Sequence, residues 1–266
     1  MPLLERHGWR PQKKLGQHFL CSEKVVRAVC DRVQGAAGIL EIGPGPGALT
    51  APLSQQAQKL IAWELDPIAV SALTETAPQA EVHFGDVLLA DLRADLARLP
   101  EPRALVSNMP YNITGPLLGK IAEVRDLFTR AVLMMQLEVG SRILAQAGDS
   151  HAGALSILMQ DPFEISKVIR VPPGAFYPPP KVESIVLELI PRPASASAAS
   201  DLFPRLVRSG FSQPRKTLAN NLRDWIAPDQ LHPLLVELGL SPQVRPHELG
   251  LDSWRKLHEK LHGPHA

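Results

Sequence analysis

The fold is indicated most directly by residues 40–47, which read LEIGPGPG. The apolar first half is typical of a buried strand, and the glycines are typical of a turn that opens a helix. Such glycines let the backbone approach a ligand closely at the carboxyl end of a strand, where open α/β sheets bind their ligands. Pro44 and Pro46 carry no backbone N–H group, so the turn is a poor phosphate cradle. The stretch therefore favours a cofactor without a pyrophosphate over a dinucleotide, with a tight turn that binds nothing as the alternative.

Strand-length and helix-length patterns alternate around this stretch, from residue 22 to about residue 161. Ser22 is expected to cap the first helix, and Pro67 to occupy the first turn of the third. Strands that alternate with helices predict a mostly parallel sheet with helices on both faces. Strands are expected at 38–43, 59–64, 81–84, 103–107 and 131–136, and helices at 22–34, 47–56, 67–76, 114–122 and 137–147.

The pattern changes after residue 161. Residues 163–170 and 182–190 are predicted strands, and the proline-rich turn between them leaves no room for a helix, so they should pair antiparallel. Residues 191–200, PRPASASAAS, have the composition of a linker. The sequence thus predicts a first domain over 1–190, a linker over 191–200 and a small all-helical domain over 201–266. Helices in the last part are expected at 201–210, 214–225, 228–238 and 251–261.

Composition limits the kind of protein this can be. The chain has 266 residues, 45% of them apolar, which suffices for one good core and a smaller second one. No apolar run approaches the roughly 20 residues of a membrane span, and Met1 to Leu20 lacks the apolar segment of a secretory signal. The only cysteines, Cys21 and Cys30, are spaced for neither a redox pair nor a zinc site. A cytoplasmic protein without a metal site is therefore expected.

Charge is distributed unevenly along the chain. Residues 1–24 hold five Lys and Arg against two Asp and Glu, and residues 203–266 hold nine against six. Residues 25–202 hold fourteen against nineteen. Basic ends around an acidic centre suit a protein whose ends contact nucleic-acid phosphates, although solvated helix faces would give the same pattern.

Two acidic residues follow the second and third predicted strands. Glu64 lies 21 residues beyond Gly43, where a carboxylate can accept hydrogen bonds from both hydroxyls of a ribose. Asp66 is expected to cap the helix that follows. Asp86 can accept a hydrogen bond from the exocyclic amine of an adenine, although a Gly-Asp pair is also an ordinary turn. Together these residues predict a nucleoside-containing cofactor.

The four residues Asn108-Met109-Pro110-Tyr111, after the fourth predicted strand, indicate the reaction. The N6 amine of adenine is a poor nucleophile because its lone pair is delocalised into the ring. The side-chain oxygen of Asn108 and the backbone carbonyl of Met109 could accept its two hydrogens and expose that lone pair. Pro110 would stiffen the loop, and Tyr111 would stack on a flipped-out base. Methyl transfer from a sulfonium needs no metal, because positioning and electrostatics supply most of the catalysis.

Further stretches suit contacts with the substrate. Phe176, in the turn before the last predicted strand, could place its ring against the other face of the base, or lie in a polyproline-like corner. Arg215, Lys216 and Arg223 are expected on a helix whose N-terminus and cations suit phosphate contacts. Lys13 and Lys14 belong to a basic N-terminal segment that is also expected to contact RNA.

These motifs in order resemble the KsgA-type family of 16S ribosomal RNA adenine dimethyltransferases, and the similarity runs over nearly the whole chain. It rests on KKLGQHFL (13–20), EIGPG (41–45), NMPYNI (108–113), PPPKVES (178–184), FSQPRKTL (211–218) and RPHEL (245–249). The resemblance implies a Rossmann-like class I methyltransferase sheet, mostly parallel with an antiparallel C-terminal hairpin strand, and a small all-helical C-terminal domain.

The resemblance also implies a cofactor and a substrate. The cofactor would be S-adenosylmethionine, with residues 1–21 over its site. His18, Leu20, Gly43, Gly45, Glu64, Asp86 and Asn108 would surround it. The substrate would be two adjacent adenosines near the 3′ end of 16S rRNA, in the small ribosomal subunit or its precursor, and methylation would belong to ribosome biogenesis. Nothing requires more than a monomer.

Three positions depart from the family pattern. Met109 stands where Leu is usual, His18 where Asn is frequent, and Pro214 where a basic residue is common. Alternatives from other classes stay open: a macrolide-resistance type of large-subunit methyltransferase, and a non-catalytic RNA- or ribosome-binding factor on the same scaffold. A DNA adenine methyltransferase and a dehydrogenase fit the loop motifs less well.

Overall fold

The computed structural model describes Gly8, residues 17–193 and residues 201–262. The chain divides into two compact units, the first made of residues 1–140 and 165–191 and the second of residues 141–164 and 192–266. Residues 141–164 therefore pack with the C-terminal helices, whereas the sequence predicted a first domain running to residue 190. Most of the predicted linker, residues 194–200, lies outside the described residues.

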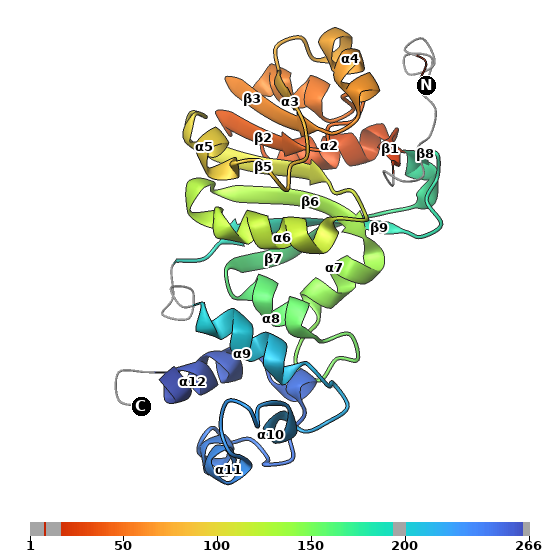
Figure 1. Cartoon of the computed structure of the whole chain (residues 1–266). Coiled ribbons are helices and arrows are strands. Elements are labelled where there is room, and N and C mark those ends of the chain that lie inside the picture. Colours follow the sequence, from red (N-terminus) through yellow and green to blue (C-terminus); the bar gives the residue numbers. More distant parts are fainter. Residues whose placement is uncertain (1–7, 9–16, 194–200, 263–266) are drawn as a thin grey trace. The chain divides into compact units, whose positions relative to one another are not determined.

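The first unit is built on a seven-stranded sheet (Figure 1). Five neighbouring strands pair in parallel, and β9 pairs antiparallel with β6, from Ala131 opposite Leu189 to Gln136 opposite Ser184. The predicted mostly parallel sheet is confirmed. In spatial order the strands are β4 (Glu81–Phe84), β3 (Lys59–Glu64), β2 (Gly38–Ile42), β5 (Arg103–Asn108), β6 (Arg130–Gln136), β9 (Ser184–Pro191) and β7 (Phe163–Val171).

The predicted pairing of the last two strands is also confirmed. Strand β7 neighbours β9, and side-chain contacts join Arg170 to Glu183 and Ser166 to Glu188. Residue numbers rise along one strand as they fall along the other, so the two strands run antiparallel. The sequence did not predict that β9 would insert between β6 and β7.

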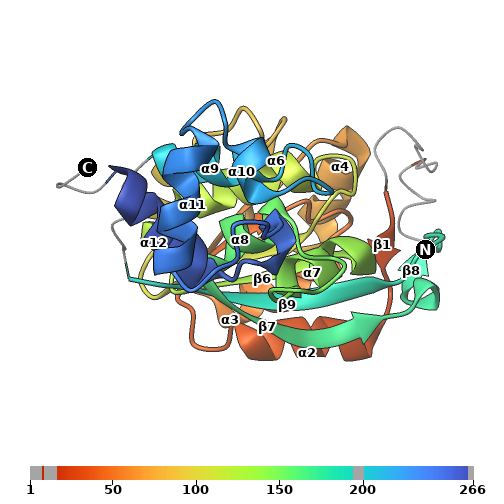
Figure 2. The ribbon, with the colours of Figure 1, turned by 90° about the horizontal axis from the view of Figure 1, so that it is seen from below.

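Both faces of the sheet are buried, as its apolar strands require. Val132 and Met134 of β6 lie in the same core cluster as Val25 and Val29, whereas Leu133 points to the other face and is also buried. Helix α2 covers the first face, and α6 lies on the opposite side of β6 and β9 (Figure 2). Helices of this unit are α2 (Glu23–Arg32), α3 (Thr50–Gln56), α4 (Pro67–Thr76), α5 (Leu92–Ala97), α6 (Thr114–Glu123) and the 3-10 turns η2 (Arg125–Leu127) and η3 (Pro173–Ala175).

Capping residues and prolines in the sequence predicted the start of some helices and not of others. Pro67 does occupy the first turn of α4, and the side chain of Asp66 caps that helix by accepting a hydrogen bond from the Ile68 amide. Ser22 holds the predicted N-cap position of α2, although its side chain makes no capping hydrogen bond. Helix α5 was not predicted, although Asp91 caps it at the Ala94 amide.

A second, two-stranded sheet was not predicted either. Strand β1 (Phe19–Leu20) pairs antiparallel with β8 (Phe176–Tyr177), with Phe19 opposite Tyr177 and Leu20 opposite Phe176. Two residues per strand are too few for a periodic pattern to reveal. This pairing joins the N-terminal segment to the turn between β7 and β9.

The second unit is helical among its described residues, apart from the start of β7. The chain enters it within α7 (Leu137–Leu144) and returns to the first unit within β7. Its core surrounds Trp254, which is fully buried, and Arg255 ties the last helix to Asp161 with a 2.8 Å ion pair. The other helices are α8 (Ala154–Gln160), α9 (Leu202–Gly210), α10 (Leu218–Asn221), α11 (Pro228–Glu237), η5 (Pro246–Glu248) and α12 (Leu251–His262).

The helix predicted at 214–225 is wrong in extent. Only Leu218–Asn221 is helical, and Thr217 caps it by accepting from the Asn220 amide. The side chain of Asn221 bonds to the backbone of Gln213 in both directions, which closes the preceding segment into a turn. None of the helices in the described part of the chain combines the length and apolar character that crossing a membrane requires.

Candidate active site

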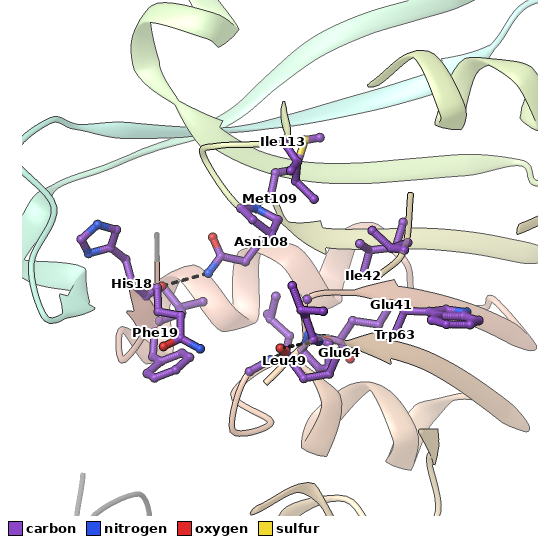
Figure 3. A pocket seen from close by; sticks show the side chains of 18 of the residues that line it. His18, Phe19, Glu41, Ile42, Leu49, Trp63, Glu64, Asn108, Met109 and Ile113 are labelled. Atoms are coloured by element: carbon purple, nitrogen blue, oxygen red, sulfur yellow. Dashed lines mark hydrogen bonds between the residues drawn. The ribbon is translucent and has the colours of Figure 1, made fainter. Parts of the chain in front are cut away.

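A cavity of about 240 Å³ opens at the carboxyl edge of the parallel strands of the first unit (Figure 3). The ends of β2, β3 and β5 and the residues after β4 contribute its walls, because parallel strands present their carboxyl ends at one edge. Most of the predicted site is brought together here. The predicted residues that line it are His18, Leu20, Gly43, Gly45, Glu64, Asp86, Asn108, Met109, Pro110 and Tyr111.

The glycine-rich turn forms the floor of the cavity. Gly43 and Gly45 adopt φ of 70° and 56°, a left-handed conformation that other residues enter at a cost. A Cβ atom on Gly45 would lie 2.9 Å from the Phe19 ring. Gly45 therefore allows strand β1 to lie across the turn, which explains why the N-terminal segment also contributes to the cavity.

Glu64 is held rigidly at the end of β3. Its Oε2 accepts from the Gly45 amide at 2.9 Å, and its Oε1 accepts from the Leu65 and Asp66 amides at 2.8 Å each. Burial raises the pKa of Glu64, and these three amides oppose that effect. A carboxylate has about four acceptor positions, so about one remains for a ligand. One ribose hydroxyl fits this capacity better than the predicted two.

Asp86 and Asp66 have different tasks. Asp86 lines the cavity, and one of its oxygens accepts from the Leu88 amide at 2.9 Å, which fixes the turn after β4. Asp66 is fully buried, caps α4 with one oxygen and accepts from the Gln17 side chain at 2.6 Å with the other. The predicted capping role of Asp66 agrees with these contacts, and the predicted contact of Asp86 with an adenine amine stays a prediction.

Sequence reasoning overlooked Glu41. It lies in the quoted stretch, lines the cavity and is 1% exposed, and its Oε2 has no hydrogen-bond partner among the described residues. Burial raises the pKa of Glu41 to about 8, the Thr50 hydroxyl lowers it, and the charge of Glu64 raises it further. The sequence did contain a sign of this site, because Glu41 is an acid inside an otherwise apolar strand. Burying an acid without a hydrogen-bond partner is costly, so such a residue often has a function.

Glu41 also tests whether S-adenosylmethionine fits. A buried acceptor without a partner suits a ligand that brings a cation and N–H donors, and this cofactor carries a sulfonium and an ammonium. The buried Oε1 of Gln17, which also lines the cavity, has no partner among the described residues either. The residues present therefore fit the implied cofactor.

The Asn108–Tyr111 loop presents two acceptors. The Asn108 Nδ2 atom donates to the His18 carbonyl at 3.1 Å, so its Oδ1 is oriented away from that contact (Figure 3). The Met109 amide donates to Met134 at 2.9 Å, which anchors the loop to β6. Neither Asn108 Oδ1 nor the Met109 carbonyl has a hydrogen-bond partner among the described residues. The predicted acceptor pair is thus available.

Tyr111 and His18 form one wall of the site. The Tyr111 hydroxyl shares a 2.7 Å hydrogen bond with the hydroxyl of Ser184 at the start of β9, and burial raises the Tyr111 pKa, so the hydroxyl stays neutral. The His18 and Tyr111 ring centroids lie 5.5 Å apart. The His18 Nδ1 donates to the Pro178 carbonyl at 2.7 Å, so His18 also fastens the N-terminal segment to the turn that follows β8.

Not every predicted residue reaches the cavity. Phe176 is 4% exposed, packs in the core cluster beside Leu20 and does not line the cavity. Stacking by Phe176 would require rearrangement of the β1–β8 pair, so this role stays a prediction without support from the geometry. Lys13 and Lys14 lie outside the described residues.

The three predicted RNA-binding residues of the second unit are exposed. Arg215 and Lys216 precede α10, and Arg223 follows it. The sequence predicted a phosphate site at the N-terminus of a longer helix. That prediction is corrected, because α10 has only four residues and its dipole is small. Their predicted role now depends on charge alone.

The fold and the site define a class. A mostly parallel sheet with the antiparallel strand β9 between β6 and β7, a cavity at the carboxyl ends of its parallel strands and an Asn-Met-Pro-Tyr loop are the features of a class I methyltransferase that uses S-adenosylmethionine. Residues 9–260 match the model of the family described as ribosomal RNA adenine dimethylase. This chain belongs to that family, which confirms the resemblance found in its sequence.

Known relatives cover nearly the whole chain. It is 39% identical over 265 residues to the ribosomal RNA small subunit methyltransferase A of Geobacter sulfurreducens, covering 96% of both chains. It is 37% identical to the protein of the same name from Picosynechococcus, covering 95% of this chain and 97% of the relative.

Solved structures give the same picture. A dimethyladenosine transferase from Plasmodium falciparum superposes with a TM-score of 0.75 at 28% identity, covering 92% of this chain and 98% of that one. The 23S rRNA methyltransferase ErmE superposes with a TM-score of 0.69 at 25% identity, covering 91% and 99%.

Proposed function

We propose that this protein transfers methyl groups from S-adenosylmethionine to N6 of two adjacent adenosines in the 3′-terminal hairpin of 16S rRNA, during assembly of the small ribosomal subunit. The observation that carries the proposal is the pair of unpartnered acceptors, Asn108 Oδ1 and the Met109 carbonyl, beside Tyr111. The relatives named for the small subunit, at 39% identity, favour this RNA over the large-subunit substrate of ErmE, at 25%. We further propose that the protein acts as a cytoplasmic monomer.

The residues of the loop would activate the amine. Asn108 Oδ1 and the Met109 carbonyl accept its two hydrogens, which draws the nitrogen toward tetrahedral geometry and directs its lone pair into the cavity. The Tyr111 ring stacks on the flipped base, and Ser184 holds that ring in place through the Tyr111 hydroxyl. When bound, S-adenosylmethionine supplies an electrophilic methyl group on a sulfonium.

The residues of the cofactor pocket would bind and orient S-adenosylmethionine. Glu64, Asp86 and Glu41 line the cavity and would hold the cofactor. Glu64 would accept a hydrogen bond from a ribose hydroxyl, Asp86 would accept one from the adenine amine, and the Glu41 carboxyl would offer an acceptor to a cationic group. Leu20 and the glycine turn provide the apolar wall and the close backbone approach. The first transfer breaks the bond between sulfur and methyl and leaves a positively charged nitrogen, which then releases one proton to solvent. One N–H remains, so the second transfer requires that hydrogen to meet one of the two acceptors. The main contribution of the Asn108–Tyr111 loop is to position the amine, and that of the cofactor pocket is to position the methyl donor.

The test is methyl transfer from labelled S-adenosylmethionine to small subunits that lack this modification, with mass mapping of the product. Dimethyladenosine at two adjacent sites near the 3′ end of 16S rRNA is expected. Large subunits serve as the matched control substrate. Transfer to large subunits alone, or binding of the cofactor without transfer to either, would overturn the proposal.

A further inference from the structure

A groove on the second unit has no role in the site described above. It lies between α9 and the segment after α10. Helical spacing places Leu202, Arg205 and Ser209 on one face of α9, with Arg208 beside them. The lining residues are Leu202, Arg205, Arg208, Ser209, Asp224 and Trp225.

An aromatic ring is held at one wall of this groove. The guanidinium carbon of Arg205 lies 5.9 Å from the centroid of the half-buried Trp225 ring. His262 contacts the same ring in a T-shaped arrangement at 5.8 Å, and the Trp225 amide donates to Leu222 at 2.8 Å. The indole therefore packs against Arg205 and His262 and also lines the groove, where it offers a ring surface to a flat ligand.

The groove also holds uncompensated positive charge. Arg205 and Arg208 are exposed and have no ion-pair partner among the described residues. By contrast, Arg255 and Lys260 of the same unit pair with carboxylates at 2.8 Å and 2.5 Å. Asp224 lines the groove, but its side chain is 90% exposed and forms an ion pair with Arg223 at 3.9 Å. Two guanidiniums on one helix face thus lack a carboxylate partner among the described residues and can bind an anion.

We infer that this groove binds one nucleotide of the rRNA, with a phosphate held by Arg205 and Arg208 and the base against Trp225. Guanidinium groups suit phosphate oxygens because they donate in a planar fork, and a base can stack on an indole whatever its sequence. Unpaired nucleotides are the part of RNA that offers both a free base face and a phosphate. The inference rests on the proposed function for the identity of its ligand.

Binding to unmethylated small subunits, measured at several salt concentrations, tests the inference. Lys256→Gln is the matched control, because Lys256 is an exposed cation of α12 without an ion-pair partner among the described residues. The double variant R205Q/R208Q should bind more weakly and depend less steeply on salt, with the slope reduced by about 1 to 2. Trp225→Leu should weaken binding about 5- to 150-fold with the slope unchanged, and Trp225→Phe should restore much of the loss.

Kinetics separate an RNA contact from loss of structure. The variants should raise KM for small subunits while kcat and the affinity for S-adenosylmethionine stay at wild-type values. The inference would be overturned if R205Q/R208Q and Trp225→Leu had the same affinity and the same KM for small subunits as Lys256→Gln. If the wild type fails to methylate small subunits, the proposed function fails. In that case the groove is tested by the affinity of the protein for a single-stranded RNA oligonucleotide. Equal affinities of the groove variants and Lys256→Gln would overturn the inference about the groove, whatever the fate of the proposed function.

Discussion

Replacing Glu41 by Gln should change how the stability of this protein depends on pH. Burial raises the pKa of Glu41 from an ordinary 4.5 to about 8, and the side chain is 1% exposed. An acid with a raised pKa is most favourable to the fold when protonated. Its contribution is therefore fully present below pH 4.5 and is lost as pH rises through 8. Gln has nearly the same shape and cannot ionise, so it removes this dependence.

The size of the effect follows from the same two pKa values. The gap of 3.5 units corresponds to about 5 kcal/mol, taken at about 1.4 kcal/mol per unit. About 2 kcal/mol of this is already lost at pH 6, which leaves about 3 kcal/mol to be lost between pH 6 and pH 9. Over that interval the wild type should lose about 3 kcal/mol more free energy of unfolding than Glu41→Gln.

Urea unfolding of the cofactor-free protein at pH 6 and pH 9 measures this difference. Glu123→Gln is the control, because Glu123 is an exposed acid at the end of α6, and this variant should follow the wild type. Equal losses in the wild type and Glu41→Gln would refute the view that Glu41 is buried without a compensating partner.

Three further substitutions test the site and the second core. Asn108→Ala should slow methyl transfer about 100-fold or more while cofactor affinity measured by calorimetry changes little, because it removes one acceptor of the amine; wild-type turnover would contradict that role. Tyr111→Ala should reduce kcat/KM about 5- to 150-fold through loss of a base stack, whereas Tyr111→Phe should keep most of the rate, and equal rates for both variants would count against stacking. Gly210→Ala places a Cβ atom 2.3 Å from the buried Trp254 ring and should cost about 1–3 kcal/mol of unfolding free energy in urea. Gly115→Ala, with no atom within 4 Å of the added Cβ, is its control, and the idea of a tightly packed second core fails if both variants are equally stable.

The position of the cavity could be predicted from sequence because one physical rule relates its parts. Gly43, Glu64, Asp86 and Asn108 each lie at the end of a strand or just after it, and the apolar runs of these strands are visible in the sequence. Parallel strands present their carboxyl ends at the same edge, so residues far apart in the chain meet there. Local periodicity and strand order were sufficient for this part of the site.

The electrostatics of the site could not be predicted in the same way. In the sequence Glu41 is one polar residue in an apolar strand, and whether its Oε2 finds a hydrogen-bond partner depends on everything packed around it. The three amides on Glu64 also come from the folded turn and not from the spacing of the motif. The pKa of a buried carboxyl reflects such surroundings, which no local pattern encodes.

The sequence by itself determined the strands of the seven-stranded sheet, most helices, the antiparallel β7–β9 pairing and the position of the acceptor loop, because these follow from periodicity, turn residues and short connections. Tertiary structure alone decided that β9 lies between β6 and β7, that residues 141–164 join the second unit, and that Phe176 is buried. It also decided that His18 bonds to Pro178, 160 residues away. Such contacts arise when distant segments compete for the same apolar surface, and their outcome depends on the packing of the whole chain.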